Sequence, residues 1–164
     1  MKDTRTDTSQ LYKYFSSNPT ECPYYLVTRA SLAATSLFKK AFAEEGLTDL
    51  KPAYLGTLLS LWKDDGLKII ELGRRAGLEP STMTGLIDRM EKDGLVSRVP
   101  DPEDRRVIRV FLTSEGRDIE LSVASVVEKV MAKILSGFED DEVALLKESL
   151  RKMLSNIHQE NADE

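Results

Sequence analysis

Between residues 69 and 94, the spacing of apolar residues and the positions of proline and glycine indicate two short helices in succession. Ile69–Ala76 has the apolar spacing of a short helix, and Gly77 stops it. Pro80–Asp93 predicts a second short helix, because it opens on a proline and ends at Gly94. Two short helices joined by a few residues that include glycine are typical of a helix-turn-helix.

The residues that follow predict a β-hairpin. Leu95–Val99 is short and apolar, and Arg106–Thr113 is rich in valine, isoleucine and phenylalanine. Between them lies a turn cluster whose two prolines, Pro100 and Pro102, are expected in the loop because proline cannot donate to a strand ladder. A helix-turn-helix followed by such a hairpin predicts a winged helix.

Long helices are predicted on both sides of this unit. Their ranges are 24–45, 52–64, 115–135 and 140–158, with Thr113 or Ser114 capping the third. The apolar faces of these helices are larger than the small winged-helix unit can cover. A second copy of the chain is therefore the expected partner. The fold class is therefore mainly α with a small β-hairpin wing. We expect a flexible arm at 1–20, dimerisation helices at 21–50 and 115–158, and a winged-helix lobe at 52–113.

Charge and composition exclude several classes of function. The net charge is −5, and residues 68–117 hold ten Lys and Arg against nine Asp and Glu, so charge alone does not indicate nucleic acid. One Cys and one His exclude an intrachain disulfide and disfavour a zinc site. No catalytic motif or cofactor motif is present, which predicts a non-enzyme without cofactors. Without a signal peptide or long apolar run, we expect a cytoplasmic protein that makes no membrane contact.

The second short helix carries the candidate DNA-reading residues. Its apolar side is expected to pack on the preceding helix, and it consists of Met83, Leu86, Ile87 and Met90. Ser81, Thr82 and Thr84 lie on or beside the opposite side, where small hydroxyls suit phosphate oxygens, and Arg89 has the length to reach a phosphate or a guanine edge. The competing interpretation is an ordinary amphipathic helix with a solvated face.

The hairpin favours the DNA interpretation. Asp104-Arg105-Arg106 puts two arginines near its tip, with Arg109 further along, and an arginine on a hairpin tip can enter the minor groove. Asp104 is expected to hold one guanidinium in place through a charge-assisted hydrogen bond. A charged, solvated turn and a winged helix that binds another protein remain the alternatives.

Taken together, these segments resemble the MarR family. The resemblance is carried by ELGRRAGL (71–78), STMTGLIDRME (81–91), KDGLVSR (92–98), DPEDRR (101–106) and VFLT (110–113), followed by Gly116. It implies an obligate homodimer of interlaced terminal helices, with the helix at 80–93 in the major groove and the hairpin in the minor groove. It also implies an Asp104–Arg106 pair and a contribution from Arg98. Gly85 departs from the pattern, since relatives often carry a basic residue there.

A two-fold dimer would bind a pseudo-palindrome of double-stranded DNA with half-sites about 34 Å apart. Regulators that resemble this chain usually repress genes until a small molecule or an oxidant releases them. Arg29, Tyr54 and Trp62 could line a pocket for an aromatic or phenolic effector, although the favoured interpretation of the two aromatic residues is that they belong to the core. Cys22, before the first helix, is the candidate for thiol-based sensing, but by our alignment Tyr25 occupies the reactive position of peroxide-sensing relatives.

Overall fold

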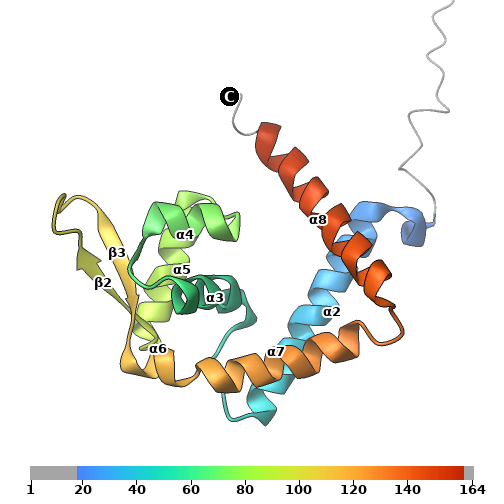
Figure 1. The fold of residues 1–164 in the computed structure, drawn as a ribbon, viewed down its shortest axis with the longest axis horizontal. Coiled ribbons are helices and arrows are strands. Elements are labelled where there is room, and N and C mark those ends of the chain that lie inside the picture. Colours follow the sequence, from blue (N-terminus) through green and yellow to red (C-terminus); the bar gives the residue numbers. More distant parts are fainter. Residues whose placement is uncertain (1–17, 161–164) are drawn as a thin grey trace, which may run out of the picture. The chain divides into compact units, whose positions relative to one another are not determined.

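The computed structural model describes residues 18–160 (Figure 1). A 3-10 turn, η1 (Pro19–Glu21), leads into the long helix α2 (Pro23–Glu44), and η2 (Pro52–Tyr54) leads into α3 (Leu55–Lys63). The flexible arm expected at 1–20 lies outside the described residues, apart from its last three positions. By the clustering of its contacts the chain divides into two compact units between Val127 and Glu128, inside α7.

The first unit contains the predicted winged helix. Strand β1 (Leu67–Lys68) precedes α4 (Ile69–Ala76) and α5 (Pro80–Lys92), and β2 (Val96–Pro100) and β3 (Ile108–Leu112) form the wing. The sheet is antiparallel with the order β1-β3-β2, and Arg98 faces Val110 across the β2–β3 pair. The mainly helical fold with a small β-hairpin wing is therefore confirmed.

Helix ends in the lobe follow the local residue types. Gly77 terminates α4 in the left-handed conformation with φ +63°, which costs a glycine little. Thr113 caps α6 (Ser114–Asp118), since its hydroxyl accepts a hydrogen bond from the Gly116 amide at 3.0 Å. Both glycine and threonine act here as the sequence predicted.

Three details of the prediction were wrong. β1 was not expected, because two residues are too few to show a strand period; Leu67 pairs with Val110 and is buried. Pro100 lies in β2 opposite Ile108 rather than in the loop, which an edge strand tolerates at its last residue. The helix expected over 115–135 is divided at Ile119 into α6 and α7 (Glu120–Ile134).

The core of the lobe forms where α4, α5 and the sheet pack together. Leu72 of α4 and Met83, Ile87 and Met90 of α5 are fully buried, as their spacing predicted. α5 packs on α4 through this face, and β2 packs beside α5. Burial of one side of α5 leaves its other side to face solvent.

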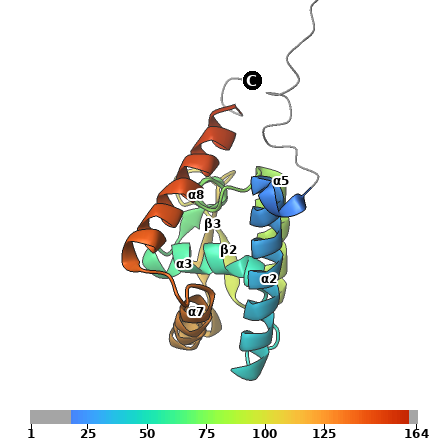
Figure 2. The ribbon, with the colours of Figure 1, turned by 90° about the vertical axis from the view of Figure 1, so that its right-hand side faces the viewer.

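Beyond the lobe, long helices keep apolar side chains exposed. α8 (Asp140–Glu160) follows the left-handed Gly137, and Figure 2 shows α2 and α8 each as one uninterrupted helix. The exposed apolar side chains of α2 include Leu26 and Leu32, and those of α8 recur at helical spacing: Leu146, Leu150, Met153, Leu154 and Ile157. Among the described helices, none combines the length and the apolar character that a membrane span requires.

Candidate nucleic-acid interface

The exposed side of α5 carries the predicted polar residues. Ser81, Thr82, Thr84 and Arg89 are all exposed, and Gly85 lies among them, where a Cβ would contact only Arg89 Nη1 at 3.8 Å. Thr84 donates its hydroxyl proton to the Pro80 carbonyl oxygen at 2.8 Å. The result is a narrow helix face whose side chains are short apart from one arginine.

The loop of the wing is organised around Asp101. Its carboxylate is 3% exposed and accepts hydrogen bonds from the amides of Glu103 and Asp104 and from Nε of Arg109, at 2.9, 3.3 and 2.6 Å. Arg109 also donates to the carbonyl oxygen of Gly66 at 3.0 Å. These contacts lower the pKa of Asp101, the backbone bond from Glu103 most and the Arg109 bond next. The wing loop is thereby tied to the turn before β1.

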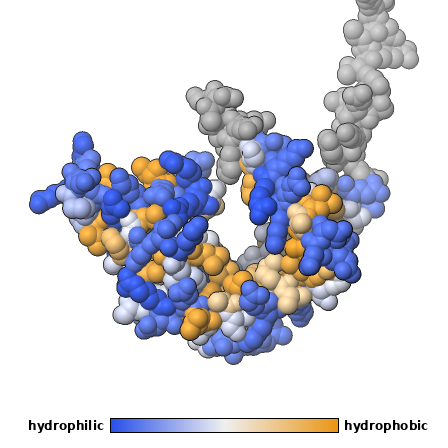
Figure 3. All heavy atoms as spheres, in the orientation of Figure 1, coloured by the Kyte–Doolittle hydropathy of each residue, from blue (hydrophilic) through white to orange (hydrophobic). Residues whose placement is uncertain are grey.

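Asp104 and Arg106 form the ion pair expected near the tip of the wing. Nε and Nη2 of Arg106 lie 3.0 and 3.1 Å from the two carboxylate oxygens of Asp104, so the pair is bidentate. The Arg106 side chain is nevertheless 90% exposed. The Arg106 hydrogen bonds lower the pKa of Asp104, which keeps the carboxylate ionised. Figure 3 shows that hydrophilic residues cover the tip of the wing, at the left, and Arg105 is exposed there too.

Arg98 has a different environment. Its guanidinium contacts Asp88 at 2.6 Å and Glu91 at 2.8 Å, and it donates to the Thr84 carbonyl oxygen at 3.2 Å. Its side chain is only 21% exposed. The structure thus uses Arg98 to join β2 to the exposed side of α5.

The structure does not bring the three effector candidates together around an open cavity. Tyr54 is fully buried, and its hydroxyl donates to Asp93 at 2.7 Å. The Trp62 indole N–H donates to the Gly116 carbonyl oxygen at 2.9 Å. Arg29 lies exposed on α2. Tyr54 and Trp62 therefore act as packing residues with satisfied polar groups, which is the interpretation of both that the sequence favoured.

Cys22 occupies the N-cap position of α2 and is partly exposed. Its backbone is extended, and its side chain makes no capping hydrogen bond. The two tyrosines that follow, Tyr24 and Tyr25, are exposed as well.

A polar cluster that sequence reasoning missed lies at the end of α5. Asp93 accepts hydrogen bonds from Lys51 Nζ at 2.6 Å and from the Tyr54 hydroxyl, and Lys51 also lies 2.9 Å from that hydroxyl. The bond from Lys51, followed by the one from Tyr54, lowers the pKa of Asp93, whereas burial raises the pKa of Tyr54. About forty positions separate Asp93 from its two partners, so no local pattern indicates the contact.

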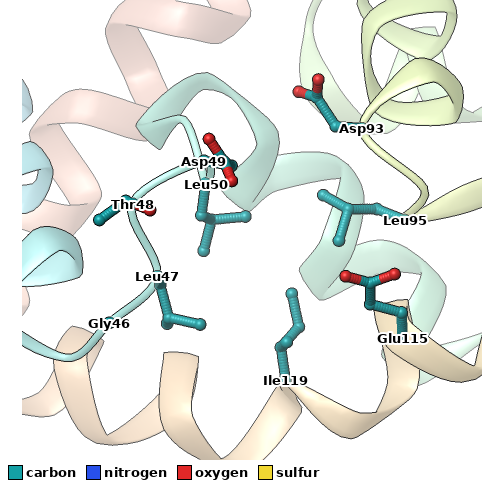
Figure 4. A pocket seen from close by; sticks show the side chains of 9 residues that line it. All are labelled: Gly46, Leu47, Thr48, Asp49, Leu50, Asp93, Leu95, Glu115 and Ile119. Carbon is teal, nitrogen blue, oxygen red and sulfur yellow. The ribbon is translucent and has the colours of Figure 1, made fainter.

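A cavity of about 150 Å³ lies beside this cluster (Figure 4). Leu47, Leu50, Leu95 and Ile119 converge on it, while the Asp93 carboxylate points away. Its lining comes from the loop after α2, the turn between α5 and β2, and α6 with its junction to α7. None of the three predicted effector residues lines this cavity.

Comparison with known proteins agrees with this architecture. The model of the MarR family matches residues 50–108. The HTH-type transcriptional regulator YsmB of Bacillus subtilis is 39% identical over 102 residues, which cover 62% of this chain and 69% of YsmB. The HTH-type transcriptional repressor MdtR of the same organism is 34% identical over 126 residues, covering 72% of this chain and 79% of MdtR.

Solved structures match over a longer stretch. CouR from Rhodococcus jostii RHA1, bound to p-coumaroyl-CoA, superimposes with a TM-score of 0.71 and 25% identity, covering 85% of this chain and 96% of CouR. Sequence similarity and winged-helix geometry lead to the same assignment: this chain belongs to the MarR family of transcriptional regulators.

Proposed function

We propose that this protein represses transcription by binding a pseudo-palindromic operator as a homodimer. In this proposal α5 lies in the major groove and the wing enters the adjacent minor groove. Ser81, Thr82 and Thr84 contact phosphates, and Arg89 reads a base edge or a phosphate. Repression is the role named for the relative MdtR.

The observation that carries the proposal is the Asp104–Arg106 pair. An arginine 90% exposed and yet held by two hydrogen bonds presents its guanidinium in a fixed orientation. Fixed orientation reduces the side-chain entropy lost when DNA binds. Arg105 adds a second cation at the tip, whereas the contacts of Arg98 within the lobe make it a support for α5.

The decisive experiment compares wild-type protein and Arg106→Ala on the DNA that flanks its gene, by footprinting and fluorescence anisotropy. We expect the variant to bind several-fold more weakly, with a flatter salt dependence. A wild-type dimer that protects no specific sequence would favour the winged-helix protein-interaction module instead. Thermal unfolding of both proteins checks that the substitution leaves the fold intact.

The homodimer is supported by the apolar faces outside the lobe. On α8, residues 143, 146, 150, 153 and 157 are apolar at alternating spacings of three and four, the pattern of a helix–helix seam. Leu150 and Met153 are each 39% exposed. A second copy of the chain would cover such side chains, and it would place two wings for a two-fold operator.

Release by a small aromatic or phenolic ligand completes the proposal. The relative CouR is bound to p-coumaroyl-CoA, a phenolic thioester. A panel of aromatic acids and their thioesters, added to the protein–operator complex, tests this step. We expect one member of the panel to lower the fraction of DNA bound. A complex that responds to none of them would indicate that the protein binds DNA constitutively.

A further inference from the structure

We propose that a groove between α4 and the wing, lined by Lys68, Arg74 and Arg106, binds the DNA phosphate backbone beside the minor groove. The proposal rests on the proposed function and extends it to a third contact surface, which adjoins the wing tip at Arg106 and includes no residue of α5. For brevity we call this surface the α4–wing groove. Its lining also includes Ile70 and Val107, and its volume is about 530 Å³.

The charges in the α4–wing groove favour an anion. Lys68 and Arg74 are exposed, and Arg106 comes from the wing loop that precedes β3. The acidic side chain in the lining, Glu71, accepts a hydrogen bond from Arg75 Nη2 at 2.8 Å, although Arg75 also pairs with Asp64. Asp104, next to the lining, is paired with Arg106. Three cations against these two carboxylates leave the groove with a net positive charge.

The position of the α4–wing groove fits one strand of a duplex. Two phosphate backbones border every minor groove, so a wing arginine that enters it has phosphates on both sides. Lys68 is the backbone partner of Arg109 in the β1–β3 pair, and its side chain lines the groove together with Arg106. The cation of β1 thus lies beside the arginine that the wing presents.

The apolar part of the lining also suits nucleic acid. Ile70 is 70% exposed at the start of α4, and Figure 3 shows hydrophobic residues at the surface between the wing and α4, bordered by hydrophilic ones. A sugar–phosphate backbone offers C–H groups of deoxyribose between its phosphates. An exposed isoleucine in a lining that also holds cations can contact these C–H groups while the cations contact the phosphates. A free inorganic anion has no apolar group for the isoleucine to contact.

The test measures binding of the double variant Lys68→Ala/Arg74→Ala by fluorescence anisotropy over a range of salt concentrations. Two probes are used, the protein's footprinted operator and a mixed-sequence duplex. Backbone contacts are independent of sequence, so we expect the affinity for both probes to fall by a similar factor. The slope of log K against log salt should flatten by about 0.9 for each phosphate that the variant no longer neutralises.

Two further variants make the result interpretable. Lys39→Ala/Lys63→Ala removes the same number of charges outside the groove and should change the slope much less. Lys68→Arg/Arg74→Lys keeps both charges and should retain the wild-type slope. The inference is overturned if the groove variant has the same slope as the Lys39/Lys63 control, or if it loses affinity for the operator alone. Failure of the wild-type protein to bind either duplex would instead contradict the proposed function.

Discussion

Arg109 Nε lies 2.6 Å from Asp101 Oδ2, so an ion pair joins the two strands of the wing at the base of its loop. The carboxylate also accepts the amides of Glu103 and Asp104, and the guanidinium reaches the carbonyl oxygen of Gly66. The residue that holds the wing loop is thus Asp101, whereas the cations exposed near its tip are Arg105 and Arg106. Local order of the loop depends on a charge that DNA would not touch.

The first prediction concerns this ion pair. Arg109→Lys keeps the positive charge but cannot reach Asp101 and Gly66 with the same fork of donors. We expect operator affinity to fall several-fold because the wing loop loses its fixed geometry. Anisotropy measures the loss, and Lys63→Arg serves as the control for an exchange of cations elsewhere. Unchanged affinity in Arg109→Lys would show that the wing needs only the charge.

The second prediction concerns the cluster of Lys51, Tyr54 and Asp93. Tyr54→Phe removes a buried hydroxyl that donates to Asp93, so the free energy of unfolding should fall by about 1 kcal/mol at neutral pH. Urea denaturation followed by circular dichroism measures it. A variant as stable as the wild type would show that Lys51 alone satisfies the carboxylate.

The third prediction follows from the lowered pKa of Asp93. The folded state favours the ionised carboxylate, so its stabilising effect is complete above the ordinary aspartate value of 3.8. As the pH falls below that value toward the lower pKa of the folded state, this contribution is lost. Asp93→Asn should therefore be less stable than wild type at neutral pH, and the difference should shrink below pH 3.8. A constant difference across that range would contradict the assignment.

The fourth prediction concerns α8. Leu150→Glu puts a charge into the apolar seam and should shift the protein from dimer to monomer, with a large loss of operator affinity. Ser155→Glu adds the same charge on the helix away from the seam and should leave the dimer unchanged. Sedimentation equilibrium distinguishes the two. A dimeric Leu150→Glu protein would exclude α8 as the centre of the interface.

The fifth prediction contrasts two glycines. A Cβ on Gly116 would overlap the carbonyl oxygen of Leu95, so Gly116→Ala should destabilise the lobe by about 1–3 kcal/mol. A Cβ on Gly85 would meet only Arg89 Nη1, at 3.8 Å, so Gly85→Ala should stabilise α5 by about 1 kcal/mol. Thermal unfolding checks both. Weaker operator binding by the more stable Gly85→Ala protein would indicate that α5 approaches DNA closely at this residue.

Redox sensing through Cys22 is separable from all of these. Mass spectrometry after mild peroxide treatment, with anisotropy on the same sample, tests it. The family resemblance puts Tyr25 rather than Cys22 at the reactive position of peroxide-sensing relatives, so we expect operator binding to be unchanged. Loss of binding in the wild type, but not in Cys22→Ser, would establish thiol-based sensing as the alternative trigger.

Much of this fold follows from short-range patterns in the sequence. Apolar spacing places Met83, Ile87 and Met90 on one side of α5, and glycine and proline mark where helices end. The Asp104–Arg106 pair was also predictable, because side chains two residues apart in one turn lie close together. In each of these cases the interacting groups lie within a few residues of one another, and backbone geometry alone brings them together.

Tertiary structure decided the contacts between distant segments. The sequence left Tyr54 and Trp62 open between pocket and core, and packing buries Tyr54 against Asp93 and gives the Trp62 indole a carbonyl partner on α6. Arg98 looked available for DNA, yet Asp88 and Glu91 engage it. The α4–wing groove includes Lys68 because the pairing of β1 with β3 brings β1 beside the wing. The type of a residue limits which partners its side chain can bind, and the tertiary structure determines which of those partners lie close to it.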